Sequence, residues 1–153
     1  MTESTSRKIV ATNRKARYNY EISDTYEAGL VLVGSEVKSL RAGQANFADS
    51  YGHIRGGEAY LIGFNIAPYA FAREGGHQPD RTRKLLLNKR EIERIRAALD
   101  EKGLTLVPLA VYFRNGKAKI ELGLGRGKRA YDKRQSIKER DMKREIQREM
   151  RSR

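Results

Sequence analysis

A chain of 153 residues is long enough for one domain with an appendage, and 39% hydrophobic residues can build one modest core. Lys and Arg number 32 against 19 Asp and Glu, and the net charge of +13 favours a polyanionic partner, nucleic acid before an anionic membrane surface. No run approaches the ~20 apolar residues that span a bilayer. The absence of Cys excludes disulfides and thiolate metal sites, neither of which a cytoplasmic protein needs.

The chain begins with a polar end, a basic cluster and a strand. Residues 1–8 are polar and are expected to form a flexible N-terminus. Residues 13–17 are mostly basic. Tyr18, Tyr20 and Ile22 then alternate with polar residues, which is the period of a β-strand.

A break, a second strand and a short helix are predicted next. Residues 28–29 indicate the break, and the continuous apolar run 30–33 indicates a buried strand. Ser35 can cap a helix, and residues 35–41 are mostly helix formers, so a short helix is expected that ends before Gly43.

The middle of the chain predicts a hairpin and a long loop. The glycines of residues 55–57 suit a hairpin turn. Residues 72–83 are polar and contain Gly and Pro, so they predict a loop in which His77 is solvated. Strands are predicted over residues 48–54, 59–66 and 84–87.

The strongest helix signal begins at Asn88. Asn88 with Glu91 three positions later has the layout of a capping box. Gly103 fits the left-handed position that ends many helices. One face of the intervening helix carries the apolar residues Ile92, Ile95 and Leu99.

Asn115-Gly116 predicts a two-residue hairpin turn, because both residues tolerate the positive φ that this turn requires. The turn fixes the register, so that Arg114 faces Lys117 and Leu109 faces Leu122. This register separates an apolar set from a polar set, whereas a slip by one residue would mix them. The apolar face comprises Leu109, Val111, Phe113, Ala118, Ile120 and Leu122, and the solvent face comprises Tyr112, Lys117, Lys119 and Glu121.

The character of the chain changes after Leu124. Residues 126–153 contain twelve basic and five acidic residues and only a thin apolar stripe, so a tail that is disordered when free and helical when bound is expected. The glycines of residues 123–128 lack the spacing of a phosphate-binding loop. They are expected instead to let the backbone leave the domain.

These elements predict a mainly β fold: a closed antiparallel barrel of the oligonucleotide-binding type, with one main helix. The predicted organisation is a flexible N-terminus over residues 1–8, an RNA-binding barrel over 9–125 and a basic C-terminal tail over 126–153.

No catalytic constellation is evident in the sequence. His53 and His77 are the only histidines, and without Cys or a spaced carboxylate pattern they do not predict a zinc site. No cofactor and no enzymatic activity are therefore expected.

Basic residues beside aromatic rings suit RNA, because cations neutralise phosphates and aromatic rings stack on unpaired bases. Any one such cluster could be merely a solubilising surface. The net charge favours RNA binding for the set as a whole. The candidates are Asn13, Arg14, Lys15, Arg17 and Tyr18, then Arg83 and Lys84, and finally Lys117 and Lys119.

Several long motifs resemble those of the SmpB family of bacterial ribosome-rescue proteins. They include NRKAR at 13–17, GSEVKSLRAG at 34–43, RTRKLLL at 81–87 and GLTLVP at 103–108. The resemblance implies a monomeric adaptor that binds the tRNA-like domain of transfer-messenger RNA (tmRNA) and delivers it to stalled ribosomes. It also implies that the tail enters the empty messenger channel, near the ribosomal RNA of the decoding centre, and folds there as a helix.

By position, Glu27, Leu86 and Lys119 match family residues implicated in RNA binding, although burial in the core would explain Leu86 equally well. Glu27 is expected to accept a hydrogen bond from a base or to orient a basic neighbour. Tyr18 and Tyr131 stand where family members have His; a tyrosine can stack on a base but cannot carry a positive charge. The ribosome-binding residues that the resemblance implies in the tail are Gly127, Lys128, Arg129, Tyr131, Asp132, Lys133, Arg134 and Met142.

Two alternatives remain open at the level of sequence. One is a barrel-type ribosomal or initiation protein, and the other is a nucleic-acid enzyme with a carboxylate site that the sequence does not reveal. An adaptor should bind a structured tRNA-like RNA with a steep salt dependence and without cleavage that depends on divalent cations.

Overall fold

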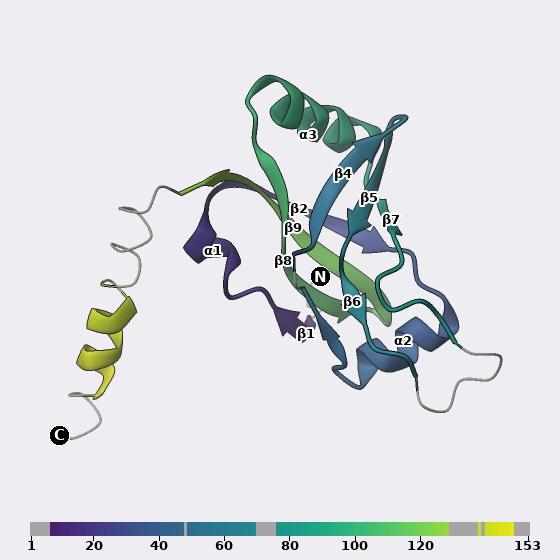
Figure 1. Ribbon diagram of the computed structural model, residues 1–153, viewed down its shortest axis with the longest axis horizontal. Helices are drawn as coiled ribbons and strands as arrows, with labels where there is room; N and C mark the ends of the chain where they lie inside the picture. The colour runs from purple at the N-terminus through teal and green to yellow at the C-terminus, as the bar shows by residue number, and fades with distance from the viewer. Residues whose placement is uncertain (1–6, 48, 70–75, 129–137, 139, 149–153) are drawn as a thin grey trace.

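The computed structural model describes residues 7–47, 49–69, 76–128, 138 and 140–148, and it is built mainly of β-strands (Figure 1). Residues 140–148 are helical. The other elements are β1 (Lys8–Thr12), α1 (Ala16–Asn19), β2 (Tyr20–Leu30), α2 (Gly34–Arg41), β3 (Ala45–Asn46), β4 (Tyr51–Arg55), β5 (Glu58–Ile62), β6 (Asn65–Ile66), β7 (Arg83–Leu86), α3 (Lys89–Glu101), β8 (Thr105–Arg114) and β9 (Lys117–Gly127).

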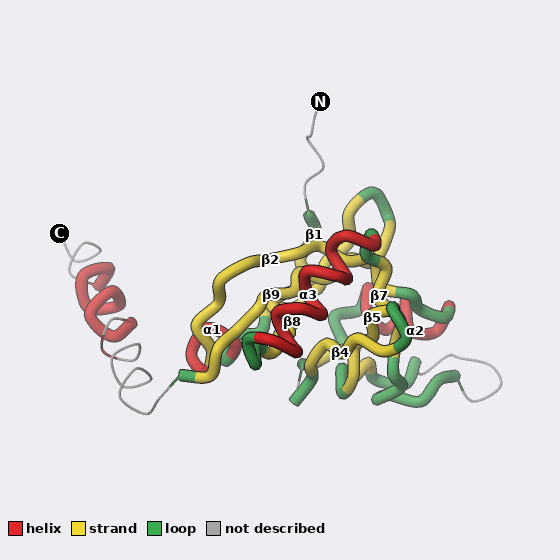
Figure 2. The backbone as a smooth tube through the Cα atoms, turned by 90° about the horizontal axis from the view of Figure 1, so that it is seen from above, coloured by secondary structure: helices red, strands yellow, loops and turns green. Residues whose placement is uncertain are grey.

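The strands form a closed antiparallel ring in the order β8, β4, β5, β7, β2 and β9, and β9 pairs with β8 to close it. β1 pairs with β8 beside the ring, and β3 and β6 form a small separate sheet. The mainly β, closed antiparallel architecture predicted from the sequence is confirmed. Seen from above, α3 lies across one end of the ring (Figure 2).

The inside of the ring is filled by apolar side chains, each of which stabilises the fold by ~1.5–3 kcal/mol on burial. Ile95 of α3 and Leu40 of α2 are buried in the same cluster, so both helices contribute to the core. The strands supply Leu61, Leu85, Leu106, Val111, Ile120 and Leu122.

The main helix and its caps are as predicted. The Asn88 side chain accepts a hydrogen bond from the Glu91 backbone N–H at 2.9 Å, and the Glu91 carboxylate accepts one from the Asn88 N–H at 3.3 Å. Gly103 follows the helix at φ +64°. Ile92 and Ile95 are buried on the inner face, which confirms the predicted capping box and apolar stripe.

Both predicted hairpins are present. Gly56 and Gly57 turn between β4 and β5 at φ +59° and +77°. The second of these strands is shorter than expected, because Gly63 at φ +80° separates β5 from β6. Asn115 and Gly116 join β8 to β9 at φ +53° and +74°.

The register of the β8–β9 hairpin is confirmed near the turn and wrong farther from it. The pairs run as predicted from Arg114 with Lys117 to Val111 with Ile120. A bulge after Pro108 then pairs Pro108 with Leu122, so Leu109 leaves the main core and packs with Ala16 in a second apolar cluster. Turn chemistry fixes the first pairs, but it does not predict a bulge several residues away.

The predicted break at residues 28–29 and the strand at 30–33 are wrong. β2 continues through Gly29 and ends at Leu30, after which Val31 and Val33 are 41% and 46% exposed. Ser35 is not the cap of α2. The cap is Val33, whose backbone N–H donates to Glu36 Oε1 at 2.8 Å.

Three smaller expectations also need correction. His77 is not simply solvated, since its Nδ1 lies 2.8 Å from the Ser35 hydroxyl and its Nε2 lies 2.9 Å from the Ile66 carbonyl oxygen. Gly123 and Gly125 lie inside β9, where an added Cβ would approach side chains of β2 to 2.7 and 2.9 Å. The paired strands run from Lys8 to Gly127, slightly beyond the predicted boundaries at 9 and 125.

Candidate nucleic-acid interface

A row of residues crosses the outside of the ring from β7 to β8. Gly29 pairs with Leu86 on one side and with Lys119 on the other, and Lys119 pairs with Tyr112. Side chains directly opposite each other point to the same face of a sheet, so Leu86 and Lys119 flank Gly29 on one surface. Glu27 stands two positions before Gly29 and shares that surface.

Leu86 is 57% exposed, so burial in the core does not explain this residue. Its neighbour Leu85 fills the core instead, because successive side chains of a strand alternate between faces. The outer surface thus brings together Glu27, Leu86 and Lys119, which come from three strands.

Glu27 is held in place by two donors from β8. The Tyr112 hydroxyl donates to Glu27 Oε2, and Arg114 Nη1 lies 2.7 Å from the same oxygen. Both contacts use Oε2, so Oε1 of this exposed carboxylate can accept a further hydrogen bond from a base or a ribose hydroxyl. The expectation that Glu27 orients a basic neighbour fits its ion pair with Arg114.

Tyr112 is buried, with 1% of its surface exposed, and is not the exposed ring predicted beside Lys119. The Arg7 guanidinium covers the ring at 4.5 Å from its centroid. Burial and the hydrogen bond to Glu27 raise the pKa of Tyr112 to about 12. Tyr112 therefore remains a protonated donor at neutral pH.

Arg83 cannot bind phosphate in this structure, which corrects its place among the candidates. The side chain is fully buried, pairs with Glu36 at 2.6 Å and donates to the carbonyl oxygens of Phe64 and Pro79. Burial alone would raise the pKa of Glu36, but hydrogen bonds from Arg81, Val33 and Arg83 outweigh it and lower that pKa. The pair fastens α2 to β7.

Lys84 and Lys117 are available on the outside of the ring. Lys84 Nζ lies 3.0 Å from Glu58 Oε1, and both side chains of this pair are more than two-fifths exposed. Exposed ion pairs contribute only about 0–1 kcal/mol, so phosphate can replace Glu58 at little cost. Lys117 follows the β8–β9 turn and is exposed.

The basic cluster around α1 lies at the other end of β2. Arg14, Lys15 and Arg17 are exposed, and Tyr18 is half-buried. Asn13 has a structural bond, since its side-chain amide donates to the Pro108 carbonyl oxygen at 2.8 Å. This cluster and the Lys119 surface lie at opposite ends of β2, since Tyr20 pairs with Gly127 and Gly29 pairs with Lys119, so the predicted RNA-binding residues form two groups.

The tail begins beside the α1 cluster. Tyr20 pairs with Gly127, and the Lys128 backbone N–H donates to the Asn19 carbonyl oxygen at 2.9 Å. Met142 lies in the helical residues 140–148 and is 65% exposed. The other predicted tail residues, Arg129, Tyr131, Asp132, Lys133 and Arg134, lie outside the described residues.

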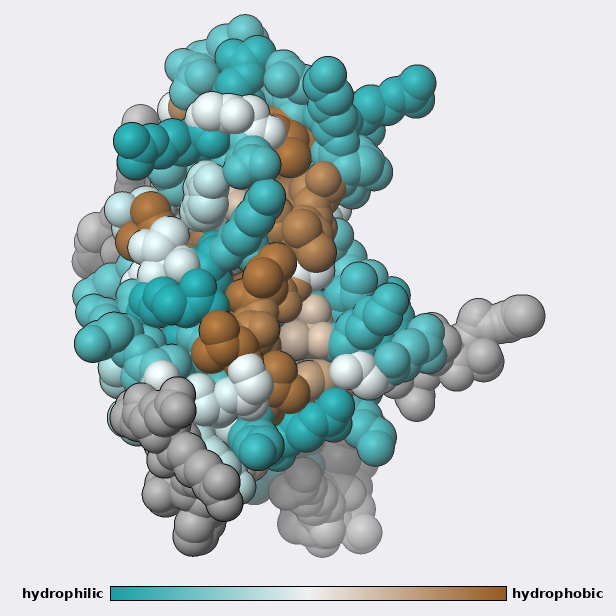
Figure 3. Space-filling model, turned by 90° about the vertical axis from the view of Figure 1, so that its right-hand side faces the viewer, coloured by the Kyte–Doolittle hydropathy of each residue, from teal (hydrophilic) through white to brown (hydrophobic). Residues whose placement is uncertain are grey.

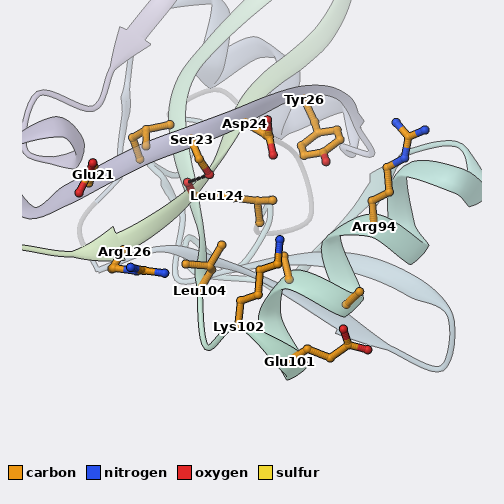
Figure 4. Close-up of a pocket in the computed structure, with 13 residues that line it drawn as sticks. Glu21, Ser23, Asp24, Tyr26, Arg94, Glu101, Lys102, Leu104, Leu124 and Arg126 are labelled. Carbon is orange, nitrogen blue, oxygen red and sulfur yellow. Dashed lines mark hydrogen bonds between the residues drawn. The ribbon is translucent and has the colours of Figure 1, made fainter.

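A cleft of about 660 Å³ between β2 and α3 carries charges of both signs (Figure 4). Three acidic residues in this cleft would repel phosphate, so it is a poorer RNA surface than the outside of the ring. Its charged lining comprises Glu21, Asp24, Glu101, Arg94, Lys102 and Arg126.

Within the described ranges, no group of three or more His, Asp or Glu side chains is placed to hold a metal ion. No helix of that part of the chain is long and apolar enough to cross a membrane.

Sequence reasoning missed the supporting arginines. The position of Arg114, directly before the β8–β9 turn, was predicted from the sequence. Its ion pair with Glu27 was not, because that contact depends on the pairing of β2 with β9. Arg41 lies over the Phe113 ring at 4.3 Å, a contact between distant segments that no local pattern predicts.

Comparison with known proteins identifies close relatives. The family model described as SmpB protein matches residues 10–152. An SsrA-binding protein of Acidothermus cellulolyticus is 56% identical over 97% of this chain and 93% of its own length, and one of Agrobacterium fabrum is 59% identical over 90% and 87%. A solved chain from "tmRNA-SmpB: a journey to the center of the bacterial ribosome" has a TM-score of 0.67 and 48% identity, covering 83% of this chain and 93% of that one.

Proposed function

The chain belongs to the SmpB family, and from this premise we propose that it is the tmRNA-binding adaptor of trans-translation. It binds tmRNA through the tRNA-like domain and brings it to stalled ribosomes in the cytoplasm. Its role is recognition and positioning, with no chemical step of its own. The observation that carries the proposal is the grouping of Glu27, Leu86 and Lys119 on one exposed surface of the ring.

We assign tmRNA to this outer surface. The side chains of Lys84, Lys117 and Lys119 can neutralise phosphates. Glu27 has a different role, because its carboxylate only accepts hydrogen bonds and the phosphates of RNA have no hydrogen to donate. A carboxylate on a basic surface therefore selects hydrogen-bond donors such as base amino groups or ribose hydroxyls.

The ribosome would meet the other end of the molecule. The basic cluster around α1 lies near Lys128, where the tail leaves β9, since the Lys128 N–H donates to the Asn19 carbonyl oxygen at the end of α1. We expect the tail to enter the empty messenger channel as a helix, with the α1 cluster against ribosomal RNA. The position of the two groups at opposite ends of β2 lets one small domain bind two RNA partners.

The test is binding of an RNA with the sequence of the tRNA-like domain by Lys119→Ala. The loss of one phosphate contact should weaken binding and reduce the slope of log affinity against log salt by about 0.7–0.9. Lys89→Ala, an exposed lysine on α3, is the matched control and should leave both quantities unchanged.

Equal thermal stability of the two variants confirms that folding is intact. Equal loss of binding in both variants would contradict the assignment to the outer surface. RNA cleavage that depends on divalent cations and is lost on mutating clustered carboxylates would favour the enzyme alternative instead.

A further inference from the structure

The outer surface of the ring changes from apolar to charged along β2. Near the end of this strand the exposed residues Val31, Val33 and Leu86 are apolar, and a hydrophobic band crosses that side of the molecule between hydrophilic residues (Figure 3). Earlier on β2, Glu27 pairs directly with Glu121 of β9. Two carboxylates therefore lie side by side on this surface, and like charges directly opposite each other destabilise a sheet.

Each of these carboxylates has its own arginine. Arg114 Nη1 lies 2.7 Å from Glu27 Oε2, and Arg7 Nη1 lies 3.8 Å from Glu121 Oε2. Arg114 is the last residue of β8, whereas Arg7 comes directly before β1. The surface thus holds two acidic and two basic side chains that neutralise one another in pairs.

Tyr112 joins the two pairs. Both guanidinium groups lie over its ring, with the Arg7 Cζ 4.5 Å and the Arg114 Cζ 5.7 Å from the ring centroid. The Tyr112 hydroxyl donates to Glu27 Oε2. Loss of the Arg7 side chain would uncover this ring and leave the charge of Glu121 uncompensated. Repulsion from Glu121 would then shift Glu27 away from the orientation that its two donors maintain.

We propose that Arg7 is a positioning residue for RNA binding, which acts on Glu27 through its neighbours. By neutralising Glu121 and covering Tyr112, it keeps the Glu27 carboxylate in place to accept a hydrogen bond from the RNA. The inference rests on the proposed function and adds to it a residue that supports the RNA surface without contacting RNA. Arg7 belongs to the polar end of the chain, in which the sequence indicates no binding residue.

The test is rescue of one variant by a second. Arg7→Ala should weaken binding of the tRNA-like RNA by about fivefold, the value of one hydrogen bond of ordinary strength. Glu121→Gln removes the charge that Arg7 neutralises, so the double variant should regain the affinity of the wild type. Glu93→Gln, on the exposed face of α3, restores the same net charge away from Glu121 and should not rescue Arg7→Ala. Binding is measured at a temperature at which thermal unfolding curves show every variant to be folded.

Two further measurements separate positioning from direct contact with RNA. Arg7→Ala should leave the slope of log affinity against log salt unchanged, because no phosphate contact is lost. In a Glu27→Ala protein it should cause no further loss, since the side chain that it positions is gone. Lys8→Ala is the matched control and should bind like the wild type, because this adjacent exposed cation makes no ion pair with Glu121 within the described ranges.

A double variant that bound no better than Arg7→Ala would overturn the positioning role, as would a smaller salt slope or losses that add in full with Glu27→Ala. Those results would leave RNA binding by the wild type intact. A wild-type protein that did not bind the tRNA-like RNA would overturn the proposed function instead, so the two failures are distinguishable.

Discussion

Arg81 and Arg83 stand two positions apart and both bind Glu36, but only Arg83 is fully buried. Removing one partner of a buried ion pair leaves the other charge without compensation, which costs about 3–5 kcal/mol. We therefore expect Arg83→Ala to lower the free energy of unfolding by about that amount in urea titrations. Arg81→Ala, at a side chain 37% exposed, should have a smaller effect.

The same variants separate a structural role from RNA binding. The folded fraction of Arg83→Ala should retain its affinity for the tRNA-like RNA. Normal stability combined with lost RNA binding would contradict the role assigned to Arg83. Sequence alone could not distinguish Arg83 from Lys84, because which face of β7 points inward depends on pairing with distant strands.

The raised pKa of Tyr112 predicts that the free energy of unfolding depends on pH in the alkaline range. Its pKa in the folded protein is about 12, above the ordinary value of about 10 for an unfolded chain. The folded state holds the proton more tightly, so this contribution is complete below about pH 10 and is lost as the pH rises towards 12.

Tyr112→Phe should remove this contribution. The difference in unfolding free energy between wild type and variant should shrink as the pH rises through that window. Urea titrations of both proteins at several alkaline pH values measure it, and comparison of the two cancels the lysines that titrate nearby. A difference independent of pH would contradict the bond between Tyr112 and Glu27.

Among the elements, the tail has the most separable role. Residues 140–148 are helical with every side chain exposed, and Met142 and Ile146 form a thin apolar stripe. So narrow a stripe stabilises an isolated helix little, so the expected disorder of the free tail stays a prediction. In Figure 1 this helix stands away from the ring.

Truncation before Asp132 should leave the affinity for the tRNA-like RNA nearly unchanged and abolish tmRNA tagging on stalled ribosomes. The physical reason is that the surface with Lys119 lies at the far end of β2 from the start of the tail. A truncated protein that lost RNA binding would contradict this division of roles.

Elements with strong local signals were predictable. Asn88 with Glu91, and Asn115 with Gly116, specify a cap and a turn through contacts of a few residues, and the structure confirms both. The bulge after Pro108 and the continuation of β2 through Gly29 depend on cross-strand contacts instead, and those predictions were wrong.

At the scale of the molecule, the ring separates the predicted RNA-binding residues into two groups on different surfaces. β2 and β9 are long enough to reach from the α1 cluster to the Lys119 surface. Basic residues that the sequence does not distinguish therefore lie on different surfaces of the protein. The net charge of +13 predicted a polyanionic partner, but no composition can reveal that the charge divides between two surfaces.

The ring also protects its most apolar strand from other molecules. β8 is buried along nearly its whole length and would template intermolecular sheets if its edge were free. β9 pairs along one edge, while β4 and β1 share the other, with β1 covering Ala110 to Phe113.

Deletion of residues 1–12 would uncover that stretch of β8. We expect the shortened protein to aggregate in a concentration-dependent manner, measured by light scattering, while the full chain stays monodisperse. A shortened protein that remained monodisperse would contradict this role for β1. Residues 9–12, which the sequence assigns to the barrel without predicting a strand there, thus form a strand that keeps the apolar edge of β8 from pairing with other molecules.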